Sequence, residues 1–363
     1  MPDMLEPSSV EALWYQAVES VKGAPAVKSA LATLTQPAQP LRVLAIGKAA
    51  SSMLQGVIDA GWRIERALVL TKYAHSLAAL NQPHIEQFES AHPVPDENSL
   101  RAGQKAQQFV ADSRDSALLV LVSGGGSALV EVLPASMTLT ELSPKTQALL
   151  AEGADIGQIN QYRRQISEIK GGKLLSHAPC AWLYSLMISD VEGDDPNTIA
   201  SGIGVCSHQH IIASNQIARQ CIAAQTPVVV NQESLYGDVV AVAKTLAATI
   251  KSGPSGLYVF GGEPTVQLPS NPGEGGRNQA LAVQLALELA VEDVFGLVAG
   301  TDGSDGPTGS AGGWFGLTPV DVPAATQALV AANAGQYLRQ TQQLFVSGPT
   351  GTNVMDLALI VKR

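Results

Sequence analysis

The carboxylates Asp302 and Asp305 lie in a glycine-rich stretch, Gly300-Thr301-Asp302-Gly303-Ser304-Asp305-Gly306, directly after the apolar residues 294–299. A strand that ends in such a loop can present hard oxygen ligands to a divalent cation, and glycine lets the backbone approach a ligand closely. A polar turn, in which the aspartates accept local backbone hydrogen bonds, explains the stretch equally well. An EF-hand is excluded because Gly313 occupies the twelfth position of a loop that begins at Asp302.

A second acidic group, Asp190, Asp194 and Asp195, follows the apolar residues 182–188. Unpaired like charges at this density normally need a metal ion or a cationic side chain nearby. The competing interpretation is that one of these aspartates caps a helix. Asp190 and Asp194 therefore join Asp302 and Asp305 as candidate metal ligands.

Two cations occupy positions that suit anion binding. Lys48 follows Gly47 at the end of a short apolar run, and Arg277 follows Gly275-Gly276 where a long Ala/Leu-rich helix is expected to begin. Positive charge beside a helix N-terminus favours phosphate or carboxylate, and the arginine fork can bind either with two hydrogen bonds. The alternative is an ordinary surface lysine or arginine. The spacing around Lys48 is not that of a P-loop.

The run Ser123-Gly124-Gly125-Gly126-Ser127 follows the most apolar predicted strand. Successive small residues can turn their N–H groups toward one anion, with two hydroxyls to help. Tight packing between a strand and a helix is the competing explanation. No GxGxxG motif follows the first predicted strand, so a nicotinamide dinucleotide is weakly supported.

The composition places these residues in a globular α/β protein. The chain has 363 residues, enough for about two domains, with 45% hydrophobic and only 15% charged residues. A formal net charge of −10 disfavours nucleic acid and anionic membranes as partners. The three cysteines lack CxxC spacing, which indicates free thiols. No apolar run could span a bilayer and the N-terminus is not a signal peptide, so we expect a cytoplasmic protein.

Short apolar runs alternate with helical patterns in the first part of the chain. Runs at 42–46, 67–70, 85–88, 117–122 and 182–188 predict buried strands, and most are followed by a polar or glycine-rich loop and then a helix. This alternation predicts a parallel, helix-covered sheet whose loops gather at the carboxyl ends of the strands. The pattern changes near residue 227, where we expect a second, smaller α/β domain.

Taken together, the loops resemble those of the MOFRL-type glycerate 2-kinases, a family that also carries the name hydroxypyruvate reductase. The matching motifs occur in one order along nearly the whole chain. They are Gly47-Lys48-Ala49-Ala50, His92-Pro93-Val94-Pro95-Asp96-Glu97, Ser123-Gly124-Gly125-Gly126-Ser127-Ala128, Ile169-Lys170-Gly171-Gly172, Ile188-Ser189-Asp190-Val191, Gly262-Glu263, Gly275-Gly276-Arg277-Asn278, Gly300 to Thr308, and Gly348-Pro349-Thr350-Gly351-Thr352-Asn353. Each motif is weak alone, whereas the ordered set is highly specific.

The resemblance implies a Rossmann-like N-terminal domain over residues 1–226, a MOFRL-type α/β domain over 227–363, and an active site in the cleft between them. It implies ATP and Mg²⁺ as cofactors and D-glycerate as the substrate, phosphorylated at its 2-hydroxyl. A homodimer is left open. The alternatives are an NAD(P)H-dependent hydroxypyruvate reductase and a catalytically impaired homologue that only binds a small molecule.

By this resemblance the catalytic residues are Lys48, Arg277 and Asp190, with Asp190 at the metal or the attacking hydroxyl. The expected nucleotide- and phosphate-binding residues are Ser123, Gly124, Gly125, Gly126, Ser127, Gly262, Glu263, Asn278 and Thr301. The chain departs from the family pattern at Gly309 and has a shorter segment at 205–210, where substrate preference or activity could change.

Overall fold

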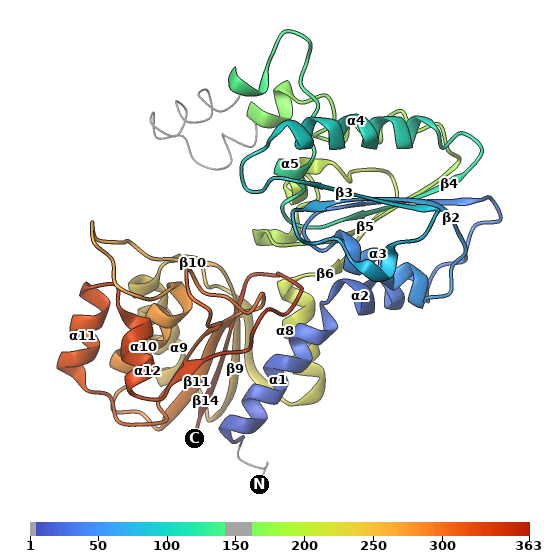
Figure 1. Cartoon of the computed structure of the whole chain (residues 1–363). Coiled ribbons are helices and arrows are strands. Elements are labelled where there is room, and N and C mark those ends of the chain that lie inside the picture. Colours follow the sequence, from blue (N-terminus) through green and yellow to red (C-terminus); the bar gives the residue numbers. More distant parts are fainter. Residues whose placement is uncertain (1–4, 142–161) are drawn as a thin grey trace. The chain divides into compact units, whose positions relative to one another are not determined.

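The computed structural model describes residues 5–141 and 162–363. The chain divides into two compact units. One, called here the N-terminal unit, comprises Lys22–Ser214, and the other, the C-terminal unit, comprises Met1–Val21 together with Asn215–Arg363. Figure 1 shows that each unit consists of a sheet covered by helices. The predicted class, two α/β domains with a parallel sheet in the first, is confirmed.

The N-terminal unit contains a six-stranded, fully parallel sheet with the order β3-β2-β1-β4-β5-β6. Its strands are β1 (Leu41–Ile46), β2 (Ile64–Lys72), β3 (Ile85–Ser90), β4 (Ala117–Val122), β5 (Trp182–Ile188) and β6 (Gln209–Ala213). Its helices are α2 (Gly23–Leu31), α3 (Ala50–Asp59), α4 (Glu97–Ala111) and α5 (Gly126–Leu129), with 3-10 turns η1 (Ala78–Leu80), η2 (Glu192–Asp194) and η3 (Ile199–Gly202). Figure 1 shows α2 and α3 on one face of this sheet and α4 on the other.

The central strands of the N-terminal unit are buried, which explains why continuous apolar runs in the sequence could predict them. All six residues of β4 are buried, as are five of the six in β1, because helices cover both faces of the sheet. Each fully buried Leu, Ile or Val contributes about 1.5–3 kcal/mol. The strand order reverses between β1 and β4, and parallel sheets bind ligands outside the carboxyl ends of strands at such a point. The loops that contain Lys48 and Ser123 begin there.

The C-terminal unit contains a mixed six-stranded sheet with the order β13-β12-β11-β14-β9-β7, in which only β7 and β9 are parallel neighbours. Its strands are β7 (Val228–Glu233), β9 (Gly256–Gly262), β11 (Val294–Gly300), β12 (Gly312–Phe315), β13 (Leu344–Phe345) and β14 (Asp356–Lys362), and β8 (Gly237–Asp238) pairs with β10 (Pro264–Thr265). Its helices are α1 (Pro7–Ser20), α8 (Asn215–Gln225), α9 (Val239–Ser252), α10 (Arg277–Glu288), α11 (Val322–Val330) and α12 (Ala334–Gln340).

The observed division differs from the expected boundary at 226/227 in two respects. The first helix, α1, belongs to the C-terminal unit, and so does α8, which lies before the expected boundary. The apolar stripe of α1, which includes Val10, Trp14 and Val18, is buried, and α1 packs against α8 and β11. Figure 1 shows α1 and α8 on the face of the sheet opposite α9 and α10. A helical apolar stripe predicts burial but does not say which sheet it covers.

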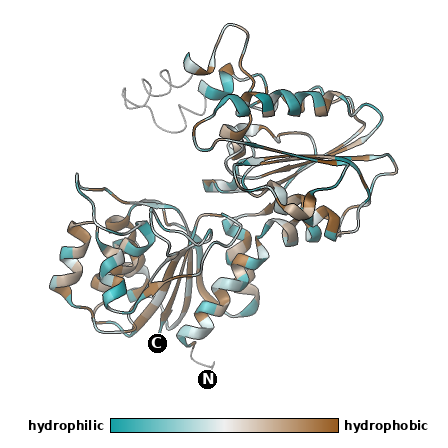
Figure 2. Ribbon diagram, viewed as in Figure 1, coloured by the Kyte–Doolittle hydropathy of each residue, from teal (hydrophilic) through white to brown (hydrophobic). Residues whose placement is uncertain are grey.

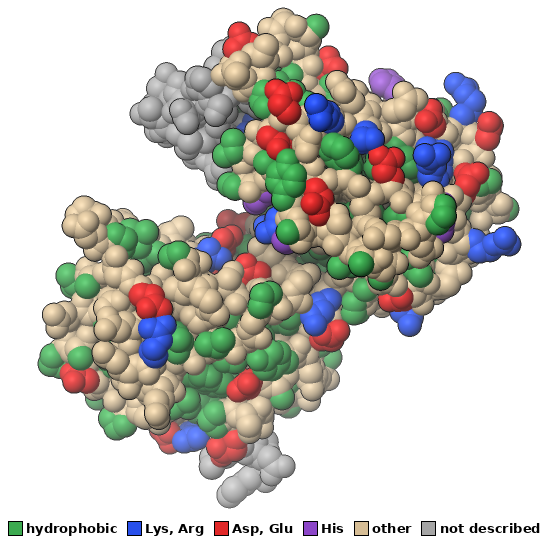
Figure 3. Space-filling view, viewed as in Figure 1, with side chains coloured by type: hydrophobic (Ala, Val, Ile, Leu, Met, Phe, Trp, Pro, Cys, Tyr) green, Lys and Arg blue, Asp and Glu red, His purple; other side chains and the backbone are tan. Residues whose placement is uncertain are grey.

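The polarity of the elements follows this layered arrangement. Figure 2 shows the strands of both sheets as largely hydrophobic and the outward faces of many helices as hydrophilic. On the face seen in Figure 3, Lys and Arg side chains are interspersed with Asp and Glu. Among the described residues, no helix has both the length and the apolar content that a membrane span requires.

Candidate active site

The loops after β1 and β4 interlock at the point where the strand order reverses. The N–H of Lys48 donates to the carbonyl of Gly124 at 2.9 Å, and the N–H of Ala49 donates to Ser123 Oγ at 3.0 Å. Gly47 has a φ of +126°, and a Cβ atom on it would lie 2.2 Å from Ser123 Oγ. Glycine at this position therefore lets the two loops approach, and the buried Ser123 serves to join them.

The glycines after β4 leave hydrogen-bond donors unused. Within the described part of the chain, the backbone N–H groups of Gly124 and Gly125 donate to no acceptor. A Cβ atom on Gly124 would lie 1.9 Å from Asp190 Oδ2, so the carboxylate of Asp190 packs directly on the loop. The side chain of Lys48 packs on Gly125 in the same way, with its Cγ 3.1 Å from a Cβ built there. The structure thus brings Lys48, Asp190 and the glycine loop together, as the sequence predicted.

Lys48 and Asp190 influence each other electrostatically. Burial raises the pKa of Asp190, and the charge of Lys48 opposes that increase. The ammonium group of Lys48 forms no hydrogen bond or ion pair with any residue that the structure describes. A half-buried, unpaired cation beside unused N–H donors is an arrangement suited to an anionic ligand.

His92 is a further member of this cluster that the sequence did not assign to the site. A Cβ atom on Gly125 would lie 3.1 Å from His92 Nε2. Burial lowers the pKa of His92, and the positive charges of Lys48 and Lys72 lower it further. A neutral imidazole at physiological pH follows. Its signal in the sequence was the motif His92-Pro93-Val94-Pro95, which follows directly after β3.

The acidic residues after β5 divide their roles. Asp195 accepts hydrogen bonds from the N–H of Asn197 at 3.0 Å and the hydroxyl of Thr198 at 3.1 Å, so it caps a local turn; it is not the N-cap of the following η3, which is Thr198. Asp194 has a buried Oδ1 without a hydrogen-bond partner among the described residues. Asp190 and Asp194 are thus the two carboxylates here that are not used to cap a turn.

Arg277, at the start of α10, is held by two carboxylates. Its Nε and Nη2 donate to Asp356 at 2.6 and 3.2 Å, and its Nη1 lies 2.8 Å from Glu263 Oε1. Burial alone would lower the pKa of Arg277, but the hydrogen bonds and charge of Asp356, with the charge of Glu263, raise it. The Arg277 side chain remains 33% exposed, whereas Asp356 is 1% exposed. Arg277 is therefore oriented by its partners and still reaches solvent.

Asp305 has a structural role that the sequence did not predict. Its carboxylate accepts from the N–H groups of Asn278 and Gln279, at 3.1 and 2.8 Å, and so caps α10 from a distant loop. Burial raises the pKa of Asp305 to about 7, although these two hydrogen bonds oppose the increase. The expected metal ligand thus already satisfies the first turn of a helix. Asn278, expected to contact nucleotide, is fully buried.

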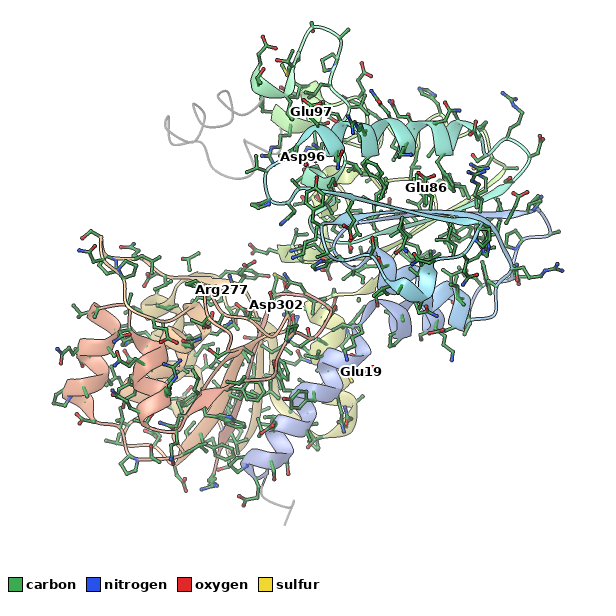
Figure 4. The ribbon with its side chains drawn as sticks, viewed as in Figure 1. Glu19, Glu86, Asp96, Glu97, Arg277 and Asp302 are labelled. Carbon is green, nitrogen blue, oxygen red and sulfur yellow. The ribbon has the colours of Figure 1, made fainter. Side chains whose placement is uncertain are left out.

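The remaining predicted residues of the C-terminal unit lie at the ends of its central strands. Thr301 is fully buried, and its hydroxyl donates to the carbonyl of Met355 at 2.6 Å. Asp302 accepts from the N–H of Ser304 at 2.8 Å, which is the polar turn weighed for this stretch. Gly262 ends β9 and precedes the exposed Glu263. Figure 4 shows Arg277 and Asp302 at the same end of this unit.

Among the described residues, no cluster of metal-binding side chains supports the metal-ligand prediction. Within residues 5–141 and 162–363, no three His, Cys, Asp or Glu side chains gather closely enough to hold a metal ion. A site in the cleft between the two domains stays a prediction. The cytoplasmic location and the oligomeric state expected from the sequence also stay predictions.

Comparison with known proteins gives the family. Residues 9–232 match the family model described as a domain of unknown function, DUF4147, and residues 256–356 match that of the MOFRL family. The chain belongs to the MOFRL-type glycerate 2-kinase family.

Relatives match along most of their length. The chain is 30% identical to the D-glycerate 2-kinase of Thermotoga maritima, over 98% of this chain and 99% of that protein. It is 31% identical to the human glycerate kinase, over 88% of this chain and 83% of the relative. The crystal structure of glycerate kinase from Thermotoga maritima superimposes with a TM-score of 0.87 at 29% identity, over 98% of this chain and 100% of that one. The alignment with the D-glycerate 2-kinase extends over 418 positions, more than the 363 residues here, so that relative has segments with no counterpart in this chain.

Proposed function

We propose that this protein is a D-glycerate 2-kinase, which transfers the terminal phosphoryl group of ATP to the 2-hydroxyl of D-glycerate. The observation that carries the proposal is the cluster at the ends of β1 and β4, where an unpaired lysine, unused N–H donors and a half-buried carboxylate converge. Full-length similarity to proteins named glycerate kinase supports the same reaction.

Lys48 and the glycine loop stabilise the phosphoryl group in this proposal. Phosphoryl transfer requires mainly that reactants be positioned and that charge on the phosphoryl oxygens be neutralised. The ammonium of Lys48 supplies the charge, and the N–H groups of Gly124 and Gly125 supply fixed donors. Because these donors have no competing partner among the described residues, they need no rearrangement before they bind an anion.

Asp190 receives the proton of the attacking hydroxyl. The oxygen at C2 forms a bond to the terminal phosphorus, the bond from that phosphorus to the bridging oxygen breaks, and ADP leaves. Burial raises the pKa of Asp190, which favours acceptance of a proton, and the charge of Lys48 opposes that increase. The neutral His92 is a second hydrogen-bond acceptor beside the same loop.

Arg277 binds the carboxylate of the substrate or a phosphate group. A guanidinium group held by Asp356 and Glu263 keeps a fixed orientation, and its exposed part can still receive a planar anion. This assignment explains why Arg277 is paired with Asp356. The buried carboxylate fixes the orientation of the guanidinium group, and the exposed part of that group remains available to an anionic ligand.

Magnesium, which the family implies, fits one part of the chain better than another. Asp190 and Asp194 provide hard oxygen atoms that are not used to cap a turn, and Asp194 Oδ1 is buried without a hydrogen-bond partner among the described residues. Asp302 and Asp305 already accept backbone hydrogen bonds. A bound Mg²⁺ at Asp190 and Asp194 would neutralise phosphate charge.

The reaction can be tested with purified protein, ATP, Mg²⁺ and D-glycerate, with the product identified by ³¹P and ¹³C NMR. We expect a phosphate ester at C2 and stoichiometric ADP. Phosphate at C3 would contradict the assigned position, and the absence of any ester would contradict the kinase proposal.

The same preparation tests the alternative reaction. Hydroxypyruvate and NADH or NADPH are added without ATP, and the absorbance of the reduced cofactor is followed. We expect no oxidation, because the loop after β1 lacks the glycine fingerprint for a dinucleotide. Oxidation at a rate above that of phosphorylation would replace the kinase proposal with the reductase.

A further inference from the structure

The turn η3 holds two residues with side chains in a backbone conformation that disfavours them. Ala200 and Ser201 have φ values of 47° and 58°, in the left-handed region. This region costs free energy for an L-residue because its Cβ crowds the following carbonyl oxygen. Both residues are buried, at 7% and 2% exposure. Such conformations persist only where the surrounding structure imposes them, and they concentrate at functional sites.

The turn presses against the glycine loop of the candidate active site. A Cβ atom on Gly126 would lie 2.9 Å from the Cβ of Ala200. The hydroxyl of Ser201 lies 2.8 Å from that of Ser127, the last residue of the loop. Ser201 is buried, whereas Ser127 is partly exposed, so a buried hydroxyl supports one that a ligand can reach.

The segment behind the turn fixes its backbone. The N–H of Gly171 donates to the carbonyl of Ser201 at 2.9 Å, and the N–H of Gly172 donates to that of Gly202 at 2.8 Å. Both glycines have positive φ values, 64° and 79°. The carbonyls of the strained turn are therefore held in register by a second glycine pair.

A buried ion pair anchors that second segment. Lys170, which precedes the glycine pair, forms an ion pair with Glu131, and each side chain is only 1% exposed. Ser167 Oγ donates to the other carboxylate oxygen of Glu131 at 2.5 Å. Glu131 lies just after α5, the short helix that begins in the glycine loop. Its ion pair with Lys170 therefore links the end of α5 to the segment that holds the backbone of η3. The desolvation of two buried charges offsets much of their attraction, but loss of either partner would leave an uncompensated buried charge, so the pair is held together.

We propose that Ser201 is a positioning residue of the anion-binding loop: it donates its hydrogen to Ser127 Oγ, so that the Ser127 hydroxyl donates to a phosphate oxygen. A hydroxyl has one hydrogen and two acceptor sites, so a hydrogen accepted from Ser201 leaves the donor of Ser127 available. Successive hydrogen bonds also polarise one another and strengthen the last donor. The inference rests on the proposed function in taking the anion to be a phosphate.

Two substitutions of Ser201 separate its proposed positioning role from its effect on folding. Ser201→Gly removes the hydroxyl and also relieves the positive φ, whereas Ser201→Ala removes the hydroxyl and keeps the strain. Ser127→Ala and the double variant Ser127→Ala/Ser201→Ala complete a cycle. Gln342→Gly is the matched control, because Gln342 has a φ of 58° in an exposed turn of the C-terminal unit.

We expect Ser201→Gly and Ser201→Ala to weaken the binding of inorganic phosphate about tenfold, as measured by ³¹P NMR titration. The KM for ATP should rise by a similar factor, with the KM for D-glycerate unchanged. The Tm should rise for Ser201→Gly and Gln342→Gly but not for Ser201→Ala. The double variant should bind phosphate no more weakly than Ser127→Ala, because both substitutions remove the same hydrogen-bond donor, the Ser127 hydroxyl.

Wild-type phosphate affinity in Ser201→Gly would overturn the inference, as would multiplicative losses in the double variant. Phosphate titration needs no turnover, so the outcome is separate from the kinase assay. A protein that binds phosphate through Ser201 but does not phosphorylate D-glycerate would contradict only the proposed function. A wild-type protein that binds no phosphate would overturn this inference.

Discussion

The two cations expected at the reaction lie in different surroundings. In the N-terminal unit, Lys48 follows a parallel strand and has no ionic partner among the described residues. In the C-terminal unit, Arg277 begins a helix beside a mixed sheet and is bound by Asp356 and Glu263. The difference is between a charge without an ionic partner among the described residues and a charge that two carboxylates hold in a fixed orientation.

The loops around these cations differ in the same way. The glycine loop after β4 leaves the N–H groups of Gly124 and Gly125 unused within the described chain. In the C-terminal unit, Asp305 caps α10 and the hydroxyl of Thr301 bonds to the carbonyl of Met355. Similar glycine-rich sequences therefore leave backbone donors unused in one unit and provide internal support in the other.

Removal of Lys48 should have the largest effect on activity. Lys48→Ala should lower kcat/KM about 100-fold, or about 2.7 kcal/mol, because the charge that neutralises the phosphoryl group is lost. The Tm should change little, since no described residue pairs with its ammonium. Lys28→Ala, on the exposed face of α2, is the control. A rate within twofold of wild type would remove Lys48 from the site.

Removal of Arg277 should affect stability as well as activity. Arg277→Met leaves the buried Asp356 without its cation, and we expect a loss of about 2 kcal/mol in the free energy of unfolding by urea. Arg339→Met is the matched control, because its pair with Glu274 is exposed and solvent-screened and should therefore contribute much less to stability. Equal losses in the two variants would contradict the supporting role of Asp356.

Asp305 should give the C-terminal unit a smaller, pH-dependent term. Its pKa is raised in the folded state to about 7 from the ordinary 3.8 of an aspartate, so between these values the folded protein binds a proton that the unfolded chain lacks. Stability should therefore fall as pH rises from about 4 to 7 and level off above.

Asp305→Asn should flatten this part of the profile by at least about 1 kcal/mol, measured by urea unfolding at a series of pH values. The charges of Asp356 and Arg277 also act on the pKa of Asp305, so the free energies of unfolding of wild type and variant are compared at each pH. Asp321→Asn, which alters an exposed cap of α11, is the control. Parallel profiles for wild type and Asp305→Asn would exclude Asp305 as the titrating group.

The proximity of the candidate residues in the N-terminal unit could be predicted largely from the sequence. Apolar strands such as β4 are legible as continuous runs, and parallel topology brings the loops after β1, β4 and β5 to one edge. Lys48, Ser123 and Asp190 were therefore expected together, and the structure places them close together, while their roles stay predictions. His92 and Ser201 were not expected in this group, because a histidine in a loop and a serine in a left-handed turn have no periodic signal.

The sequence by itself determined the α/β class, the parallel first sheet and the loops that could bind an anion, since each depends on local patterns of apolar residues and glycine. Only the tertiary structure decided which aspartates remain available. Asp305 and Asp190 both follow apolar strands within a few residues of glycine, yet one caps a helix that begins 28 residues earlier and the other packs on the glycine loop. The packing of α1 against α8 and β11 likewise placed α1 in the C-terminal unit, because long-range contacts decide which sheet a helix covers.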